Sequence, residues 1–193
     1  LTTLGDRACS GTRITSFEVG ASLLPEDPDL QTESGLVSTA FVGASRLREF
    51  TVAEGNGVFE AVEGVLYRHL TVDDGTVAFE YLELISYPAY RDEGAYTVAD
   101  DTLRIAPYAF YGAANLDEVT LPATLQSIGA SAFEGCTYLY KVTFLSAQAP
   151  ALEGEYDGTD GTAYKNFVGG IGSVPALTAE IPSNATGYDT RVW

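Results

Sequence analysis

Few residues of this chain have the types and spacing that catalysis requires. The single histidine, His69, has no partner recognisable in the sequence, and the 193 residues contain no zinc-hydrolase, serine-hydrolase or phosphate-loop motif. The many carboxylates leave a glycosidase-type acid pair open on number alone, but the short repeats described below offer little concavity in which to raise the pKa of one acid. We therefore predict no catalytic residue and no enzymatic activity.

Two stretches could bind a ligand by composition alone. Four carboxylates, Glu153, Glu155, Asp157 and Asp160, lie among glycines and could hold Ca²⁺ together with backbone carbonyls. The ligand order of an EF-hand is missing, so a polar loop is the simpler interpretation, and calcium binding at 153–160 stays open. Residues 169–172 are glycine-rich but lack the G-x-G-x-x-G order that cradles a pyrophosphate. We predict no metal-binding residue, no cofactor-binding residue and no cofactor.

The net charge of −17 excludes several classes of partner. Nucleic-acid binding requires a positive stripe, and only ten Lys and Arg are spread through the chain. No apolar run reaches the roughly 20 residues needed to cross a membrane, so we expect no nucleic-acid partner and no membrane insertion of this segment. The chain has no Met and no signal-peptide pattern, so we interpret it as a mature or trimmed piece, which does not argue against secretion.

An Ala-x-x-Gly motif, with an aliphatic residue four positions before its Ala, recurs at a fixed period. The clearest copies span 105–112 and 128–135, and their alanines, Ala109 and Ala132, are 23 positions apart. A third copy spans 36–43, three periods before the first, and a fourth spans 4–11 with Cys9 in the Phe slot. Such a period is the signature of a solenoid, in which each unit buries its apolar side only by stacking on its neighbours.

Each motif is followed by a segment with the alternation of a strand. Apolar and polar residues alternate at 50–52, 119–121 and 142–144, the pattern of a strand with one buried face. The link before it is short and rich in small residues, which favours a turn or a single helical turn. The sequence therefore predicts an α/β or mainly β solenoid of about 23-residue units, with short parallel strands roughly 4.8 Å apart and single-turn helical connectors.

This architecture makes specific residues part of the core. The apolar positions of the two best units should be buried in columns, and the three Phe residues of the motif should form one aromatic ladder. The buried columns are expected to contain Leu116, Val119, Leu121, Leu139, Val142 and Phe144, and the ladder Phe41, Phe110 and Phe133.

Two parts of the chain carry the pattern of a known repeat. Ile128-Gly129 through Phe144 reads almost as I-G-x-x-A-F-x-G-C-x-x-L-x-x-V-T-[IL]-P, and Leu121-Pro122 supplies the final proline. A pattern of the form G-V-L-Y…Y-P…Y-T-V is present at 64–67, 87–88 and 96–98. These residues resemble the BspA-type leucine-rich repeat family of bacterial surface proteins, over roughly 36–150. The resemblance implies a leucine-rich repeat fold, with adhesion or protein binding at a cell surface as the usual inferred function.

We interpret the chain as a single leucine-rich repeat domain over 1–193. Residues 1–35 would be a degenerate first unit with an inserted loop at 25–29, and 36–150 the repeat body. Within the body, 59–104 is irregular, with strands near 64–70 and 77–87 joined by a turn at 73–76. Residues 151–193 are expected to cap the last open edge of the stack.

The two cysteines are expected to be separate, buried thiols. At least four rungs of about 4.8 Å lie between the units of Cys9 and Cys136, which places the two roughly 20 Å apart. A disulfide spans a Cα separation of no more than ~7 Å. The pair neither demands nor excludes an extracellular setting.

The candidate binding site is a strip along the strands, because residues at one phase of a solenoid line up. Two positions in each regular unit, five and eight residues after the Gly, combine charge, aromatic rings and hydroxyl groups. The first position holds Arg48, Asp117 and Tyr140, and the second holds Thr51, Thr120 and Thr143. Rigid strands present such side chains at little entropic cost. A solvated sheet face is the alternative and is at least as common.

Several classes of function agree with these observations. The first is a non-enzymatic, cell-surface or secreted bacterial module for adhesion or protein binding, with a host or bacterial surface protein as partner. The second is a carbohydrate-binding module, for which Tyr111, Tyr138 and Tyr140 are candidates because their slots vary between repeats. The third is a structural spacer without a ligand inside a larger surface protein. All three place the chain at the cell surface or outside the cell.

Overall fold

The computed structural model describes residues 1–25, 35–73, 78–153 and 178–188. In these ranges the chain is built almost entirely of short strands, and its one helical element is a single 3₁₀ turn, η1 (Ser38–Phe41). The strands are β1 (Ser16–Val19), β2 (Glu49–Val52), β3 (Phe59–Val62), β4 (Val65–Asp73), β5 (Ala78–Ser86), β6 (Ala95–Thr97), β7 (Thr102–Ile105), β8 (Glu118–Leu121), β9 (Ser127–Ile128), β10 (Lys141–Phe144), β11 (Ala151–Leu152) and β12 (Thr178–Glu180). Within the described ranges, no helix has the length and apolar character to span a bilayer.

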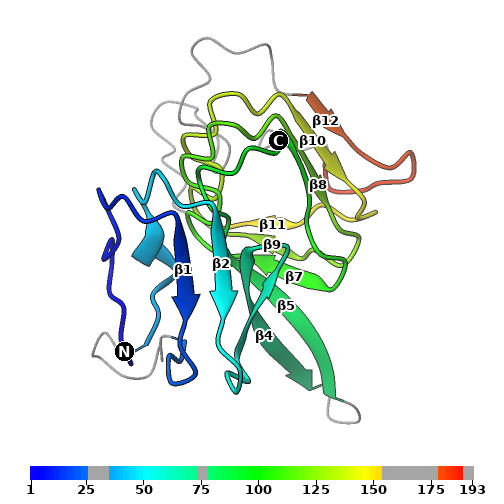
Figure 1. Cartoon of the computed structure of the whole chain (residues 1–193). Helices are drawn as coiled ribbons and strands as arrows, with labels where there is room; N and C mark the ends of the chain where they lie inside the picture. The colour runs from blue at the N-terminus through cyan, green and yellow to red at the C-terminus, as the bar shows by residue number, and fades with distance from the viewer. Residues whose placement is uncertain (26–34, 74–77, 154–177, 189–193) are drawn as a thin grey trace, which may run out of the picture.

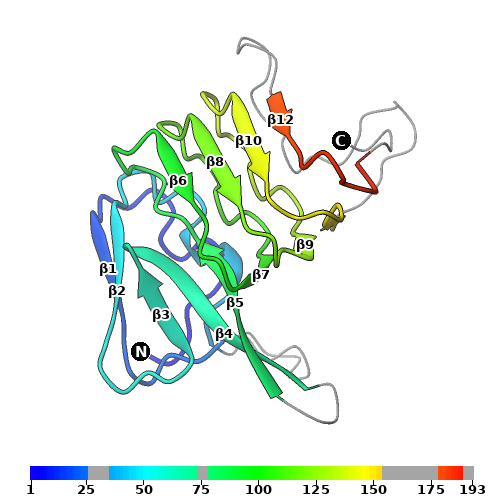
Figure 2. The ribbon, with the colours of Figure 1, turned by 90° about the vertical axis from the view of Figure 1, so that its right-hand side faces the viewer.

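Two parallel ladders carry the regular units. Strands β6, β8, β10 and β12 form one sheet, and β5, β7, β9 and β11 form the parallel part of a second, six-stranded sheet. Figure 2 shows the two rows of strands running side by side along the molecule. Val119 pairs with Val142 in one ladder and Ile105 with Ile128 in the other, so the pairing register equals the 23-residue period of the sequence. The predicted short parallel strands are therefore confirmed.

The connectors of the two best units stack through backbone hydrogen bonds between one unit and the next. The amide of Phe110 donates to the carbonyl of Ala132 at 2.8 Å, and that of Gly112 donates to Glu134 at 2.9 Å. Each connector also contains a residue with left-handed backbone geometry, Tyr108 or Ser131, with φ of 57° and 54°. Because an α-helix needs right-handed residues and its own i→i−4 bonds, these connectors form turns. The predicted helical connector is thus seen only at η1, and the α/β alternative is wrong for the described residues.

The predicted core columns are confirmed in the structure. All six apolar residues of the regular strands and their entries, Leu116, Val119, Leu121, Leu139, Val142 and Phe144, are at most 7% exposed. Because side chains alternate along a strand, Glu118 and Thr120 of β8 lie on the opposite face. Lys141 and Thr143 of β10 lie on that face too. Each ladder strand therefore has one apolar face toward the core and one polar face toward solvent.

The aromatic ladder differs from the prediction at one position. Phe110 stacks on Phe133 with ring centroids 4.6 Å apart, as expected, but Tyr87 is the next rung, 5.1 Å from Phe110. Phe41 instead packs edge-on against Phe17 and Phe50. The prediction is wrong for Phe41 because the irregular segment enters between the copy at 36–43 and the copy at 105–112. The amide of Tyr87 donates to the carbonyl of Ala109 at 2.7 Å, which places Tyr87 in the connector column.

The irregular segment contains the expected pair of strands as a hairpin. Strands β4 and β5 pair antiparallel, while the turn between them, at 74–77, lies outside the described residues. On one side β3 pairs antiparallel with β4, and on the other β5 pairs parallel with β7. The hairpin projects from the body in Figure 1. Its insertion separates the two-stranded sheet of β1 and β2 from the ladder that begins at β6.

Buried tyrosines fasten this segment to the regular units. The hydroxyl groups of Tyr67 and Tyr96 are 2.7 Å apart, and the Tyr67 hydroxyl also accepts a bond from the amide of Ala99. Burial raises the pKa of Tyr67 and Tyr96, and it raises the pKa of Tyr87 to about 12. The fold therefore holds all three phenols in their neutral form.

Both cysteines are free thiols, as predicted. Cys9 is buried in the first connector, where its amide donates to the carbonyl of Ala40 at 3.0 Å. Cys136 is partly exposed as a residue, but its thiol donates to the carbonyl of Phe110 at 3.1 Å. Burial of this sulfur raises the pKa of Cys136 to about 12, so the thiol stays protonated and unreactive at neutral pH.

The stacked rings predict a large effect of truncation. Replacing Phe133 by Ala removes a ring that is 2% exposed and stacked on Phe110, and we expect the free energy of unfolding to fall by about 3–5 kcal/mol. The matched control is Phe79→Ala, because that ring is 46% exposed. Denaturant melts should show a large loss for the first variant and a small one for the second. Equal midpoints for Phe133→Ala and wild type would contradict the stacked core.

The close approach of neighbouring units predicts that Gly129 cannot carry a side chain. A Cβ atom at Gly129 would lie 2.4 Å from the backbone nitrogen of Pro107 and 2.6 Å from the carbonyl carbon of Ala106. We expect Gly129→Ala to destabilise the protein by about 1–3 kcal/mol through overpacking. Gly57→Ala is the control, since a Cβ there meets nothing within 4 Å. If both variants melt at the wild-type temperature, the units are not packed this closely.

The buried phenols predict a loss of stability at high pH. Below pH ~10 the folded and unfolded chains both hold these protons, so their contribution is fully present. As the pH rises above that value, the unfolded chain releases protons that the folded chain keeps, and the free energy of unfolding must fall. Urea melts at rising alkaline pH measure this slope. The Tyr87→Phe variant should have a shallower slope, whereas Tyr138→Phe, at an exposed ring, should keep the wild-type slope.

Candidate binding surface

The outer face of the β6–β8–β10–β12 sheet is polar and regular. Because side chains alternate along each strand, burial of Val119 and Leu121 turns Glu118 and Thr120 outward, and the same register is repeated on β10. Two rows of outward residues cross the four strands. The first row is Ala95, Glu118, Lys141 and Thr178, and the second is Thr97, Thr120, Thr143 and Glu180. In Figure 2 these strands lie next to one another.

Charged groups on this face hold one another in place. The Lys141 ammonium lies 3.2 Å from the carboxylate of Glu180 and 3.8 Å from that of Glu118. The hydroxyl of Tyr140 donates to the carboxylate of Glu118, which raises the pKa of Tyr140. Hydrogen bonding to Glu180 likewise raises the pKa of Lys141. These exposed pairs add little stability, and they draw the charged groups together on one patch of the face.

Four of the six predicted strip residues meet on this face. Asp117 and Tyr140 are neighbours across the two units, since the Tyr140 amide donates to the Asp117 carbonyl at 2.9 Å. Thr120 and Thr143 are paired in the ladder and half-buried, and the Thr143 hydroxyl lies 3.4 Å from Glu180. The ring of Tyr140 is exposed beside them.

The other two predicted residues belong to the separate β1–β2 sheet and its approach, with Thr51 on β2 and Arg48 directly before it. Thr51 is exposed there and pairs with Glu18, while Arg48 forms an ion pair with Asp92. The Arg48 guanidinium also lies 4.7 Å from the centre of the Tyr90 ring. The structure thus divides the predicted strip in two, because the hairpin replaces the unit that would have joined β2 to β6.

A short segment at 90–94 bridges the two parts of the strip. The Tyr90 amide donates to the carbonyl of Leu47 at 2.8 Å, and the carbonyl of Gly94 accepts from Asp117 at 2.6 Å. This segment carries no strand, so its side chains do not continue the rows of the ladder. Arg48 and Thr51 therefore belong to a different local surface from Asp117 and Tyr140.

Sequence reasoning missed two residues of the outer face. Thr97 extends the threonine row by one strand, and Glu180 ends it. Thr97 lies 23 positions before Thr120, so the period itself contained the signal. Glu180 is not at a multiple of the period from Thr143, and only the pairing of β12 with β10 places it there.

The tyrosines predicted to be exposed differ among themselves. Tyr138 and Tyr140 are 62% and 40% exposed, whereas Tyr111 is half-buried against Tyr108, with ring centroids 5.9 Å apart. Tyr138 lies in the turn that enters β10, and Tyr140 comes directly before that strand. The exposed aromatic surface of this sheet is therefore concentrated at one end of β10.

Metal-ligating side chains do not gather anywhere in the described ranges. No group of three or more His, Cys, Asp or Glu residues there is close enough to hold an ion. His69 is exposed, with Nε2 4.0 Å from a carboxylate oxygen of Glu60. The acidic loop considered for Ca²⁺ lies outside the described residues from 154 onward.

Comparison with known proteins gives a family and a set of similar structures. Residues 100–150 match the family described as BspA type Leucine rich repeat region (6 copies). None of the curated proteins matches the sequence. The solved structure of a leucine rich cell surface protein from Faecalibacterium prausnitzii A2-165 is similar, with 26% sequence identity and a TM-score of 0.57. The similarity covers 75% of this chain and 34% of that protein, so the chain spans about a third of its length.

Two further solved structures have lower similarity. A leucine-rich repeat protein from Eubacterium ventriosum ATCC 27560 is 20% identical over 70% of this chain and 38% of its own, with a TM-score of 0.47. The pneumococcal vaccine antigen PcpA is 22% identical over 75% of this chain and 43% of its own, with a TM-score of 0.45.

The family match and the geometry agree on the same units. The matched range contains β7 to β10, where the strand register equals the 23-residue period and the connectors stack through their backbones. The fold is accordingly leucine-rich-repeat-like and consists mostly of strands. Residues 100–150 therefore match the BspA-type leucine-rich repeat, and the chain is similar in fold to a bacterial leucine-rich cell surface protein.

Proposed function

We propose that this chain is a non-enzymatic protein-binding module at a bacterial cell surface, and that the outer face of the β6–β8–β10–β12 sheet binds the partner. The ordered face around Tyr140, Glu118 and Lys141 is the observation that carries the proposal. The similar cell surface protein supports the location, and the stacked units supply an extended surface of the kind that repeat proteins use for binding. The division of the chain into a first unit, a repeat body and a cap belongs to the same proposal.

The charge of this face favours a basic partner. Glu118 and Glu180 share a single ammonium group, that of Lys141, and Asp117 adds a negative charge near Tyr140. The whole chain has a net charge of −17. An acidic surface attracts a cationic protein over a distance of about 8–10 Å at moderate ionic strength. The exposed ring of Tyr140 can then serve as an anchor, because aromatic residues are enriched at the centres of interfaces.

The rigidity of the face favours binding by the strands over binding by loops. Its side chains stand on hydrogen-bonded strands, and the two carboxylates of the network are held by Lys141 before any partner arrives. The side chains of this face therefore lose little entropy when a partner docks, which leaves more of the interaction energy for affinity.

Tyr140 and Tyr138 give a second candidate, a sugar that stacks on these exposed rings.

A capture experiment with a matched control tests the proposal. Proteins retained by the immobilised chain from its native surroundings are identified, produced in pure form, and their direct dissociation constants measured. The triple variant Asp117→Ala, Tyr140→Ala, Thr143→Ala should weaken binding at least about tenfold, through loss of an aromatic anchor and a charge. The control Ser16→Ala, Glu18→Ala, Thr51→Ala changes exposed residues of the β1–β2 sheet and should leave the constant unchanged.

Other outcomes distinguish the alternatives. Equal binding by wild type and the Asp117/Tyr140/Thr143 variant, or a loss confined to the control, would show that the partner binds elsewhere. A glycan array that reports specific binding, abolished by Tyr140→Ala, would assign this face to carbohydrate instead. Absence of any specific partner in both assays would leave the structural spacer.

A further inference from the structure

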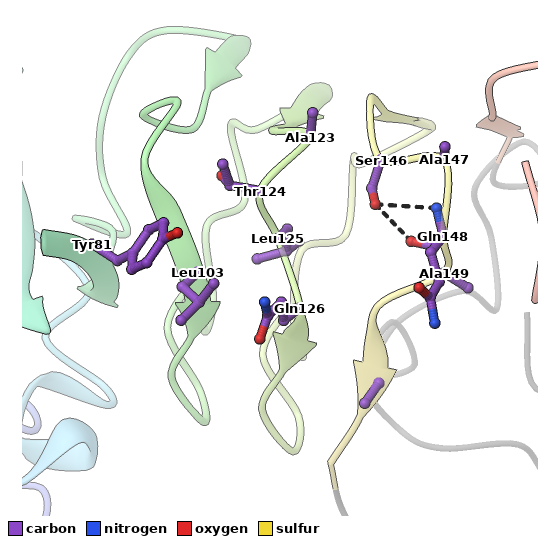
Figure 3. A pocket seen from close by; sticks show the side chains of 11 residues that line it. Tyr81, Leu103, Ala123, Thr124, Leu125, Gln126, Ser146, Ala147, Gln148 and Ala149 are labelled. Atoms are coloured by element: carbon purple, nitrogen blue, oxygen red, sulfur yellow. Dashed lines mark hydrogen bonds between the residues drawn. The ribbon is translucent and has the colours of Figure 1, made fainter. Parts of the chain in front are cut away.

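A groove beside the second ladder offers chemistry that the outer face lacks. It has a volume of about 660 Å³ and crosses successive units, with Tyr81 at one end, Leu103 and Leu125 along it, and Gln148 toward the other end (Figure 3). Pockets of this size accommodate small organic ligands. The groove shares no residue with the outer face of the β6–β8–β10–β12 sheet.

The residues that the structure describes along the groove carry no charge. No Asp, Glu, Lys, Arg or His is among its described lining residues, although 19% of the chain is charged. A charged ligand would lose its hydration without gaining a counter-charge, which is costly. A negatively charged ligand would in addition be repelled by the net charge of −17. The groove therefore suits a neutral ligand.

Some polar groups in the groove already form hydrogen bonds within the protein, and others can bond to a ligand. The hydroxyl of Thr124 donates to the carbonyl of Thr102 at 2.9 Å, and that of Ser146 donates to the carbonyl of Gln148 at 2.7 Å. The side-chain amides of Gln126 and Gln148 are exposed and form no hydrogen bond within the described part of the chain. Each amide can both donate and accept, so the pair matches the hydroxyl groups of a sugar.

An aromatic ring completes this set of groups. Tyr81 is half-buried on β5, between β4 and β7, and its ring lies 6.5 Å from that of Phe79. Its position in the sheet orders the ring, and in Figure 3 the ring stands at the end of the groove. The apolar C–H face of a pyranose packs against such a ring, while its hydroxyl groups reach the amides.

The walls of the groove are fixed before any ligand enters. The Ser146 hydroxyl also accepts a bond from the backbone amide of Gln148 at 3.3 Å, and the Tyr188 hydroxyl donates to the Ser146 carbonyl at 3.1 Å. The ring of Tyr188 in turn packs edge-on against Phe144 of the core. Thr124 and Ser146 thus position the backbone, and a ligand does not have to order it.

From the uncharged residues described along the groove, the two exposed side-chain amides and the ordered ring, we propose that this groove binds a neutral, linear oligosaccharide. The groove follows the stacking direction of the units, so an extended chain of sugars lies across several rungs spaced roughly 4.8 Å apart. Tyr81 stacks on one sugar ring, and Gln126 and Gln148 bind hydroxyl groups farther along. This site is independent of protein binding on the other ladder.

Calorimetric titration with defined oligosaccharides tests the groove. The probes are cellotetraose, xylotetraose, mannotetraose, maltotetraose and chitotetraose as neutral chains, and tetragalacturonate as an anionic one. We expect at least one neutral probe to bind wild type and the anionic probe not to bind. Tyr81→Ala should weaken binding about tenfold or more, and Gln126→Ala roughly three- to tenfold, the loss of one hydrogen bond.

Controls separate this site from the outer face and from misfolding. Tyr138→Ala removes an exposed ring outside the groove and should bind as wild type, as should the Asp117/Tyr140/Thr143 variant. Gln126 is exposed, so Gln126→Ala keeps the test valid if Tyr81→Ala fails to fold. The proposal is overturned if wild type binds no neutral probe at millimolar concentration, if tetragalacturonate binds most tightly, or if only the Tyr138 or Tyr140 changes reduce binding. The first two results leave the proposed protein partner of the outer face untouched, whereas the third would assign the outer face to carbohydrate.

Discussion

Stacking of one unit on the next is the constraint on which the rest of this structure depends. A unit of about 23 residues has too little apolar surface for a core of its own, so Phe110 is buried only because Phe133 and Tyr87 lie on either side of it. Backbone bonds such as Phe110 to Ala132 hold neighbouring connectors at a fixed distance. That distance leaves no room for a Cβ atom at Gly129, next to Pro107.

The same constraint explains why surface residues are arranged in rows. Once the register of β8 and β10 equals the sequence period, the outward positions of successive units must lie beside one another. Those positions do not contribute to the core, so their identity is free to serve binding. On the outer face these positions hold an ionic network around Lys141. Along the groove by the second ladder they hold neutral groups such as Gln126.

The hairpin of β4 and β5 is the main departure from regular stacking. It turns the second sheet from parallel to antiparallel pairing, and it removes the strand that would have joined β2 to β6. The cost of this interruption is limited because Tyr87 enters the aromatic ladder and Tyr67 bonds to Tyr96 in the core. This insertion also shapes the two candidate sites, since the hairpin separates Arg48 from Tyr140 and places Tyr81 at the end of the groove.

The sequence alone determined what repeats locally. The period predicted the parallel strands, the buried positions Val119 and Val142, and the threonine row at Thr120 and Thr143, because each of these follows from one unit being copied onto the next. Tertiary structure decided what does not repeat. Where the irregular segments pack decides three features that the period does not predict. These are the place of Phe41, the separation of Arg48 from the outer face, and the position of Glu180. The groove was also invisible in the sequence, because Tyr81, Gln126 and Gln148 are brought together only by folding and share no motif.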